Sequence, residues 1–149
     1  MLLLVLVVTS CGRPFPADPD HTLERVQGNT LRVGVSPHPP WTEIGPGGRP
    51  TGREVALVRG FADRLGAEPI WVAGGEEQLV TAMEHHELDL FIGGLSADTP
   101  WSDKVAVTRP YLKTTDARGD RLELVMAAPL GENAFLRSLE TYLHEAVPQ

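Results

Sequence analysis

Apolar residues along the middle of the chain recur at two spacings, one typical of strands and one typical of helices. Short, strongly apolar runs occupy residues 31–35, 69–73 and 88–94, and the first of them alternates as a strand does. Residues 53–66 and 74–87 each carry an apolar stripe on one helical face. The order strand, helix, strand, helix, strand, with short connections, predicts a parallel sheet with helices packed on its faces.

The C-terminal part adds two more elements. Residues 122–128 are apolar enough for a buried strand. Asn133 is a suitable N-cap for a final helix, whose inward face would carry Phe135, Leu136, Leu139 and Leu143. We therefore expect an α/β fold with three layers, α/β/α, built on a mostly parallel five-stranded sheet.

Two loops of this fold follow strands that end at the same edge of the sheet. Ligands of such sheets bind beyond the carboxyl ends of the strands. Glycines let a ligand approach the main chain, short polar side chains orient it, and tryptophans supply flat apolar walls. The two loops predict a site for a small-molecule solute, made of Ser36 and Trp41 in the first and of Gly93, Gly94, Leu95, Ser96, Asp98, Thr99 and Trp101 in the second.

The same features have a purely structural interpretation. Gly93 and Gly94 suit a tight turn, and Asp98-Thr99-Pro100 suits the start of a helix. Trp41 lies in a long loop, residues 36–52, and folding back onto the sheet edge would cover its indole. The residues alone leave both interpretations open.

The N-terminus has the composition of an export signal. The apolar run from Leu2 to Val8 is far shorter than the roughly 20 residues needed to cross a bilayer. Val8-Thr9-Ser10-Cys11 resembles a bacterial lipobox, in which the cysteine becomes the lipidated first residue, although no Lys or Arg precedes the apolar run. A buried strand with an ordinary cysteine is the alternative interpretation.

On this basis the chain divides into three parts. Residues 1–11 form a lipoprotein-type signal segment, 12–29 form a proline-rich spacer, and 30–147 form one folded lobe. The signal predicts export to the periplasm or the outer cell surface, with the protein held to the membrane through lipidated Cys11.

The composition argues against several classes of partner. The formal net charge of −7 and the lack of a run of Lys and Arg argue against nucleic acid. Cys11 is the one cysteine, so no intrachain disulfide is expected. His85, His86 and Glu87 are adjacent on a predicted helix and point in different directions, and no recognisable zinc spacing is present, so we expect no metal and no cofactor.

Several landmarks follow one another in a fixed order between Leu31 and Lys113. They are Pro39-Pro40 before an aromatic residue, Thr51-Gly52, the turn Gly93-Gly94-Leu95-Ser96, and Arg109-Pro110-Tyr111. In this order they closely resemble the type 2 periplasmic solute-binding proteins, and among these the family 3 group associated with amino-acid uptake. The resemblance implies one lobe of the periplasmic-binding-protein type 2 fold, and a receptor that presents its solute to an ABC transporter permease.

The chain departs from that family in two respects. Members carry a second lobe after the segment that matches Arg109 to Lys113, whereas this chain continues into the closing strand and helix, so we expect a single lobe. The resemblance also implies an arginine that binds the solute's α-carboxylate, at the position where this chain has Trp101. It implies aromatic contacts with the solute near the positions of His38 and Glu76, and these two residues complete the predicted site. An indole cannot replace a bidentate guanidinium, which argues against a free α-amino acid as the solute.

Three kinds of function follow from these observations. The first is a solute receptor with an open lobe, completed by a homodimer or by a permease or sensor protein. The second is a protein-interaction or regulatory module that keeps the fold without solute transport. The third is an enzyme, since some relatives on this fold are dehydratases, but His38, Glu43, Glu76 and Asp98 include no pair with a recognisable catalytic spacing. We favour the receptor and expect no enzymatic activity.

Overall fold

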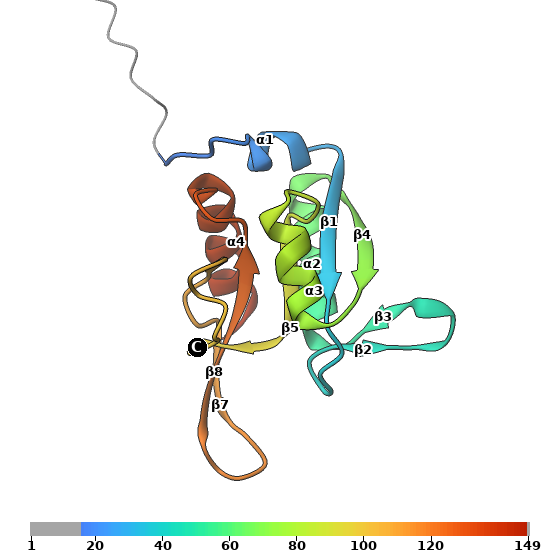
Figure 1. The fold of residues 1–149 in the computed structure, drawn as a ribbon, viewed down its shortest axis with the longest axis vertical. Helices are drawn as coiled ribbons and strands as arrows, with labels where there is room; N and C mark the ends of the chain where they lie inside the picture. Colours follow the sequence, from blue (N-terminus) through green and yellow to red (C-terminus); the bar gives the residue numbers. More distant parts are fainter. Residues whose placement is uncertain (1–15, 149) are drawn as a thin grey trace, which may run out of the picture.

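The computed structural model describes residues 16–148, whose centre is a six-stranded sheet (Figure 1). The strand order is β4-β1-β5-β8-β6, and β7 also pairs with β8. Strands β4, β1 and β5 are parallel, whereas β8 is antiparallel to β5, β6 and β7. The bounds are β1 Thr30–Val35, β4 Glu68–Ala73, β5 Leu90–Ser96, β6 Ala106–Val107, β7 Leu112–Thr115 and β8 Arg121–Ala128.

Helices cover both faces of this sheet (Figure 1). Helices α2 (Arg53–Leu65) and α4 (Asn133–Ala146) pack on one face, where Phe61 and Phe135 meet edge to face at 5.8 Å. Helix α3 (Glu76–Glu84) packs on the other face through Leu79, Val80 and Met83. Alternate residues of β5 serve the two cores, since Leu90 and Ile92 face α2 while Phe91 and Leu95 face α3. The predicted α/β fold with three layers is confirmed.

The structure differs from the prediction in two details of this fold. The sheet has six strands instead of five, because β6 and β7 both add short ladders to β8. The final helix is preceded by Glu132 at its N-cap position, so Asn133 is its first residue and not its cap. The extent of strand pairing and the residue that caps a helix both depend on tertiary contacts. The periodicity of apolar residues carries no information about such contacts.

The described residues form one lobe, and they continue into a hairpin at the position where the resemblance implies a second lobe in family members. Strands β7 and β8 form a hairpin whose register pairs Leu112 with Leu124 and Thr115 with Arg121. The turn between them is closed by the N–H of Asp116, which donates to the carbonyl of Asp120 at 2.9 Å. The described chain therefore returns directly to the sheet.

The N-terminal segment packs onto the lobe earlier than the expected spacer allows. A short helix, α1 (Thr22–Val26), places Thr22 and Val26 in buried positions. The carboxylate of Glu132, itself buried, accepts hydrogen bonds from the N–H groups of Asp20 (2.9 Å) and Thr22 (3.0 Å). The spacer was expected to run to residue 29, but the residues from Ala17 onward pack on the folded lobe, where they bond to buried Glu132 and to the first turn of α4.

Residues of this segment also satisfy the first N–H groups of α4. The carbonyl of Ala17 accepts from Asn133 (2.8 Å) and Ala134 (3.1 Å), and the carboxylate of Asp18 accepts from Phe135 (3.3 Å). The first turn of a helix has no internal partners for these donors. The segment thus acts as an external cap for α4, and we call residues 17–26 the N-terminal strap.

The predicted signal segment, including Cys11, lies outside the described residues. Within residues 16–148, no helix has the length and apolar character required to cross a bilayer. Lipidation of Cys11 remains a prediction from the sequence.

A buried carboxylate at the amino edge of the sheet ties the strap to the strands. Asp89, fully buried, accepts hydrogen bonds from the main-chain N–H of Arg32 (2.9 Å) and from the guanidinium groups of Arg32 (2.6 Å) and Arg25 (2.6 Å). Desolvation raises the pKa of Asp89, but these donors outweigh it and hold the pKa below its usual range. Arg25 belongs to α1, so this cluster joins α1, β1 and β5.

Replacing Asp89 by Asn should lower the free energy of unfolding by about 1.5–3 kcal/mol, because the buried acceptor loses its charge. The two arginine side chains that pair with it are 39% and 32% exposed, so water compensates part of their loss. A folded-state pKa below the unfolded value makes this stabilisation complete at neutral pH. It is lost as the pH falls from about 3.9, the unfolded value, through the folded pKa. Urea denaturation from pH 7 to pH 3 measures both effects. Exposed Asp103, replaced by Asn, is the control and should change stability by less than about 0.5 kcal/mol.

Candidate functional site

The predicted site residues lie together at the carboxyl edge of the sheet, opposite the strap (Figure 1). The first loop leaves β1 at Ser36, α3 begins at Glu76 just after β4, and the second loop leaves β5 after Ser96. Because β4, β1 and β5 are parallel neighbours, their carboxyl ends meet at one edge. We call this surface, made of Ser36–Trp41, Glu76 and Ser96–Trp101, the carboxyl-edge lip.

The first loop is held by a compact set of hydrogen bonds. The hydroxyl of Thr42 donates to the carbonyl of Ser36 at 2.5 Å, and the N–H of His38 donates to the carbonyl of Thr42 at 2.8 Å. Beyond it, β2 (Glu43–Ile44) and β3 (Pro50–Thr51) form a small hairpin around the 3-10 turn Pro46–Gly48. The long loop is therefore ordered, and it leaves His38 exposed and Trp41 half-buried.

Both interpretations of Trp41 describe part of its environment. One part of the indole packs against the larger core cluster, as covering the sheet edge requires. Its Cδ1 lies 2.7 Å from the position that a Cβ on Gly94 would occupy. Gly94 has φ of +62°, a conformation that favours glycine. Gly94 thus permits close contact with Trp41 and His38 of the protein itself.

The second loop is a series of turns that positions four side chains. The Ser96 hydroxyl is hydrogen-bonded to the Asp98 carboxylate, and the Thr99 N–H donates to the Ser96 carbonyl at 2.9 Å. The Trp101 indole N–H donates to the Glu76 carboxylate at 2.9 Å. This last bond joins the second loop to the start of α3, so that two of the predicted residues touch directly.

The predicted site residues at this edge of the sheet differ in their exposure to solvent. His38 and Asp98 are exposed, while Trp41, Glu76, Ser96 and Trp101 are half-buried. Ser36, Gly93, Gly94, Leu95 and Thr99 are buried, and the Leu95 side chain belongs to the core under α3. The structure brings the whole set to one edge, and contact with a solute stays a prediction for each member.

Glu54, which the sequence analysis did not select, is the central residue beneath the lip. It is fully buried, and its Oε2 accepts hydrogen bonds from the N–H groups of Gly93 (3.0 Å) and Gly94 (2.9 Å). Its Oε1 accepts the Tyr111 hydroxyl at 2.6 Å. A solute that approaches the main chain at Gly93 and Gly94, as the sequence predicts, would find both N–H groups already donating to Glu54.

Burial governs the acid–base properties of this pair. Desolvation raises the pKa of Glu54, and the hydrogen bonds from Tyr111, Gly94 and Gly93 oppose that rise. Desolvation and the neighbouring Glu54 carboxylate raise the pKa of Tyr111, so its hydroxyl remains a donor throughout the physiological range. A signal for Glu54 existed in the sequence: it shares a helical face with Val58 and Phe61, in the middle of the apolar stripe.

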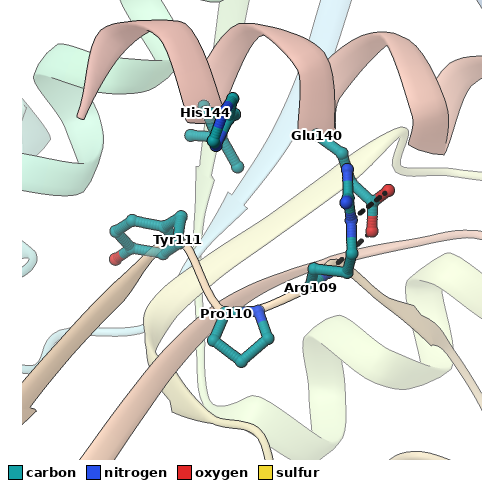
Figure 2. A pocket seen from close by; sticks show the side chains of 6 residues that line it. Arg109, Pro110, Tyr111, Glu140 and His144 are labelled. Atoms are coloured by element: carbon teal, nitrogen blue, oxygen red, sulfur yellow. Dashed lines mark hydrogen bonds and ion pairs between the residues drawn. The ribbon is translucent and has the colours of Figure 1, made fainter. Parts of the chain in front are cut away.

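A hollow of about 260 Å³ lies away from the lip, between α4 and the segment before β7 (Figure 2). There the main-chain N–H of Arg109 donates to Oε1 of Glu140 in α4 at 2.7 Å, and its side-chain Nε donates to Oε2 at 3.2 Å. Figure 2 shows the Tyr111 ring turned away from this ion pair. Arg109 is therefore engaged at α4 and does not replace the arginine that the resemblance implied near Trp101.

Within residues 16–148, no group of three or more His, Cys, Asp or Glu side chains is arranged to hold a metal ion. His86 instead lies 3.1 Å from the Asp20 carboxylate, at the amino edge of the sheet.

Comparison with known proteins gives a family match and many similar folds. The family model described as bacterial extracellular solute-binding proteins, family 3, matches residues 31–118. A search of curated protein sequences finds no match.

Three solved structures illustrate the structural likeness. The arginine-bound Phe57Trp mutant of domain 1 from TmArgBP, the ArgBP of T. maritima, is 24% identical with a TM-score of 0.69, over 80% of this chain and 92% of that one. The Salmonella typhimurium periplasmic binding protein STM4351, described as highly specific for arginine, is 10% identical with a TM-score of 0.68, over 79% and 93%. AncCDT-1, an ancestral amino-acid-binding protein and precursor of cyclohexadienyl dehydratase, is 15% identical with a TM-score of 0.68, over 83% and 92%.

Replacing Gly94 by Ala tests the packing of the two loops at the lip. The new Cβ would meet Trp41 Cδ1 at 2.7 Å and His38 Cγ at 3.1 Å, so we expect a loss of about 1–3 kcal/mol from overpacking in addition to backbone strain. Gly48, with φ of +74° and no atom within 4 Å of its Cβ position, isolates the strain, about 1–2 kcal/mol when replaced by Ala.

Urea denaturation gives the two stabilities, and near-ultraviolet circular dichroism reports the tryptophan environment. The expected result is a larger loss and an altered tryptophan spectrum for Gly94→Ala only. Equal losses with unchanged spectra would show that the loops are not packed as described.

Proposed function

Because the chain belongs to the bacterial extracellular solute-binding proteins of family 3, we propose that it is an extracytoplasmic receptor for a small polar solute of the amino-acid type. The solute binds on the carboxyl-edge lip of a single open lobe. The receptor is anchored through lipidated Cys11 and presents its solute to an ABC-type permease. It binds its solute without turnover.

The observation that carries this proposal is the likeness to an isolated lobe. The described fold matches domain 1 of the T. maritima arginine-binding protein over 93% of that domain, and that structure is the arginine-bound form. In that protein, therefore, one lobe holds a solute without the rest of the receptor. The lip described above occupies the edge at which sheets of this type bind their ligands.

The exposed and half-buried groups of the lip define what a solute would contact. Trp41 and Trp101 supply apolar walls, Ser96 and Asp98 supply a hydroxyl and a carboxylate, and His38 lies at the rim. Glu76 adds a second carboxylate beside Trp101. Two carboxylates and two indoles suit a cationic group, since indole faces attract cations. We propose arginine-like cations as the first solutes to test.

A single lobe covers only part of a solute, so the affinity is expected to be low. If half the contacts of a micromolar binder are lost, binding falls towards the millimolar range, from about −8 to about −4 kcal/mol. A second copy of the chain, or the permease, would supply the missing wall.

Thermal unfolding of the full chain in mild detergent, with L-arginine and with agmatine at about 10 mM, tests the proposal. With a dissociation constant of about 1 mM, the linkage stabilisation is about 1.4 kcal/mol, which raises the melting temperature by several degrees. Agmatine is arginine without its carboxylate. Because Trp101 stands where a carboxylate-clamping arginine is implied, we expect agmatine to bind within about threefold of arginine, a difference below 0.7 kcal/mol.

Variants locate the binding to the lip. Trp101→Ala and Ser96→Ala should each reduce the shift, whereas Ser102→Ala, an exposed serine of the same loop, should leave it unchanged. A folded protein that responds to no amino acid, amine, sugar or organic acid at this concentration would contradict the receptor and favour the interaction module.

A further inference from the structure

Glu54 connects the two loops of the lip through different parts of one residue. Its side chain accepts the N–H groups of Gly93 and Gly94, which precede the second loop. Its main-chain N–H donates to the carbonyl of Trp41, in the first loop, at 3.1 Å. Trp41 and His38 of the first loop also lie against Gly94 near the end of β5, just before the second loop.

The carboxylate has a geometry that suits an anion held by main-chain donors. Two consecutive N–H groups converge on one oxygen, and the Tyr111 hydroxyl takes the other. A carboxylate that is fully buried is stable only when donors such as these replace water. The main-chain conformation at Gly93 and Gly94 is therefore coupled to the charge of Glu54 and to the position of Tyr111.

We infer that Glu54 is the positioning residue of the carboxyl-edge lip, which fixes the Gly93–Gly94 segment of β5 against the Ser36–Trp41 loop without touching the solute. This inference rests on the proposed function for its effect on binding. Its structural content, that one buried residue sets the position of the end of β5 against the first loop, stands independently of any solute. A fully buried side chain cannot contact a solute, which separates positioning from recognition.

The test compares two buried carboxylates at opposite edges of the same sheet. Glu54→Gln keeps the shape of the side chain and removes its charge, and Tyr111→Phe removes one donor with less disturbance. Asp89→Asn is the matched control, because it also removes a buried, hydrogen-bonded carboxylate but lies at the amino edge. All three are studied as full chains under conditions in which each is folded.

The first readout needs no solute. In ¹H–¹⁵N NMR spectra we expect Glu54→Gln to move the amide signals of Gly93 and Gly94 and the signals of His38 and Trp41, and to speed amide exchange at the two glycines about tenfold or more. Tyr111→Phe should give the same pattern with smaller changes, and Asp89→Asn should leave these signals in place. Changes confined to the two glycines would overturn the inference, because the first loop would then be independent of Glu54.

The second readout is the dissociation constant of L-arginine, measured by titration of the same spectra. We expect Glu54→Gln to weaken binding by about tenfold or more and Asp89→Asn by less than about twofold, since loosely held binding groups lose affinity. Equal weakening in both variants would indicate general destabilisation and contradict a positioning role. If the parent chain does not respond to arginine or any other solute, the proposed function fails, while the first readout still decides whether Glu54 holds the lip.

Discussion

A buried carboxylate loses its hydration, so it needs hydrogen-bond donors from the protein, and the segments around Glu54 supply them. Three donors from β5 and from the segment before β7 converge on it, and its own N–H reaches the first loop. Each of these donors would be left unsatisfied if its segment moved away. The first loop, β5 and the residue before β7, which are far apart in sequence, are thereby held around one residue, and the edge of the sheet has a defined shape before any solute arrives.

The amino edge of the sheet follows the same principle with a different set of partners. Asp89 accepts hydrogen bonds from the guanidinium groups of Arg25 and Arg32, while Glu132 accepts them from main-chain N–H groups of the N-terminal strap. The strap in turn satisfies the first turn of α4. Both edges therefore depend on buried acids, although the overall charge of −7 gives no reason to expect acids inside the protein.

Much of the fold could be predicted from the sequence, because its main signals are local. The stripe through Val55, Val58 and Phe61 and the alternation in residues 31–35 determine which faces are buried. The position of the lip followed from the order of the elements. Glu54, Asp89 and Glu132 could not be predicted in the same way, because their donors come from residues 39 to 112 positions away. For the same reason the strap was predicted to be a spacer, since its contacts with Glu132 are too distant in sequence to be recognised.

The strap also determines how an anchored lobe would stand on a membrane. Ala17 is bound to the beginning of α4 at the amino edge, opposite the lip. The six residue steps from Cys11 to Ala17 span at most about 20 Å when fully extended. A lipid on Cys11 would therefore be a short tether that keeps the amino edge near the lipid headgroups. The lip would then face away from the membrane. Delivering a solute to a permease in that membrane would then require the whole lobe to reorient, or a partner protein that extends above the bilayer to the lip.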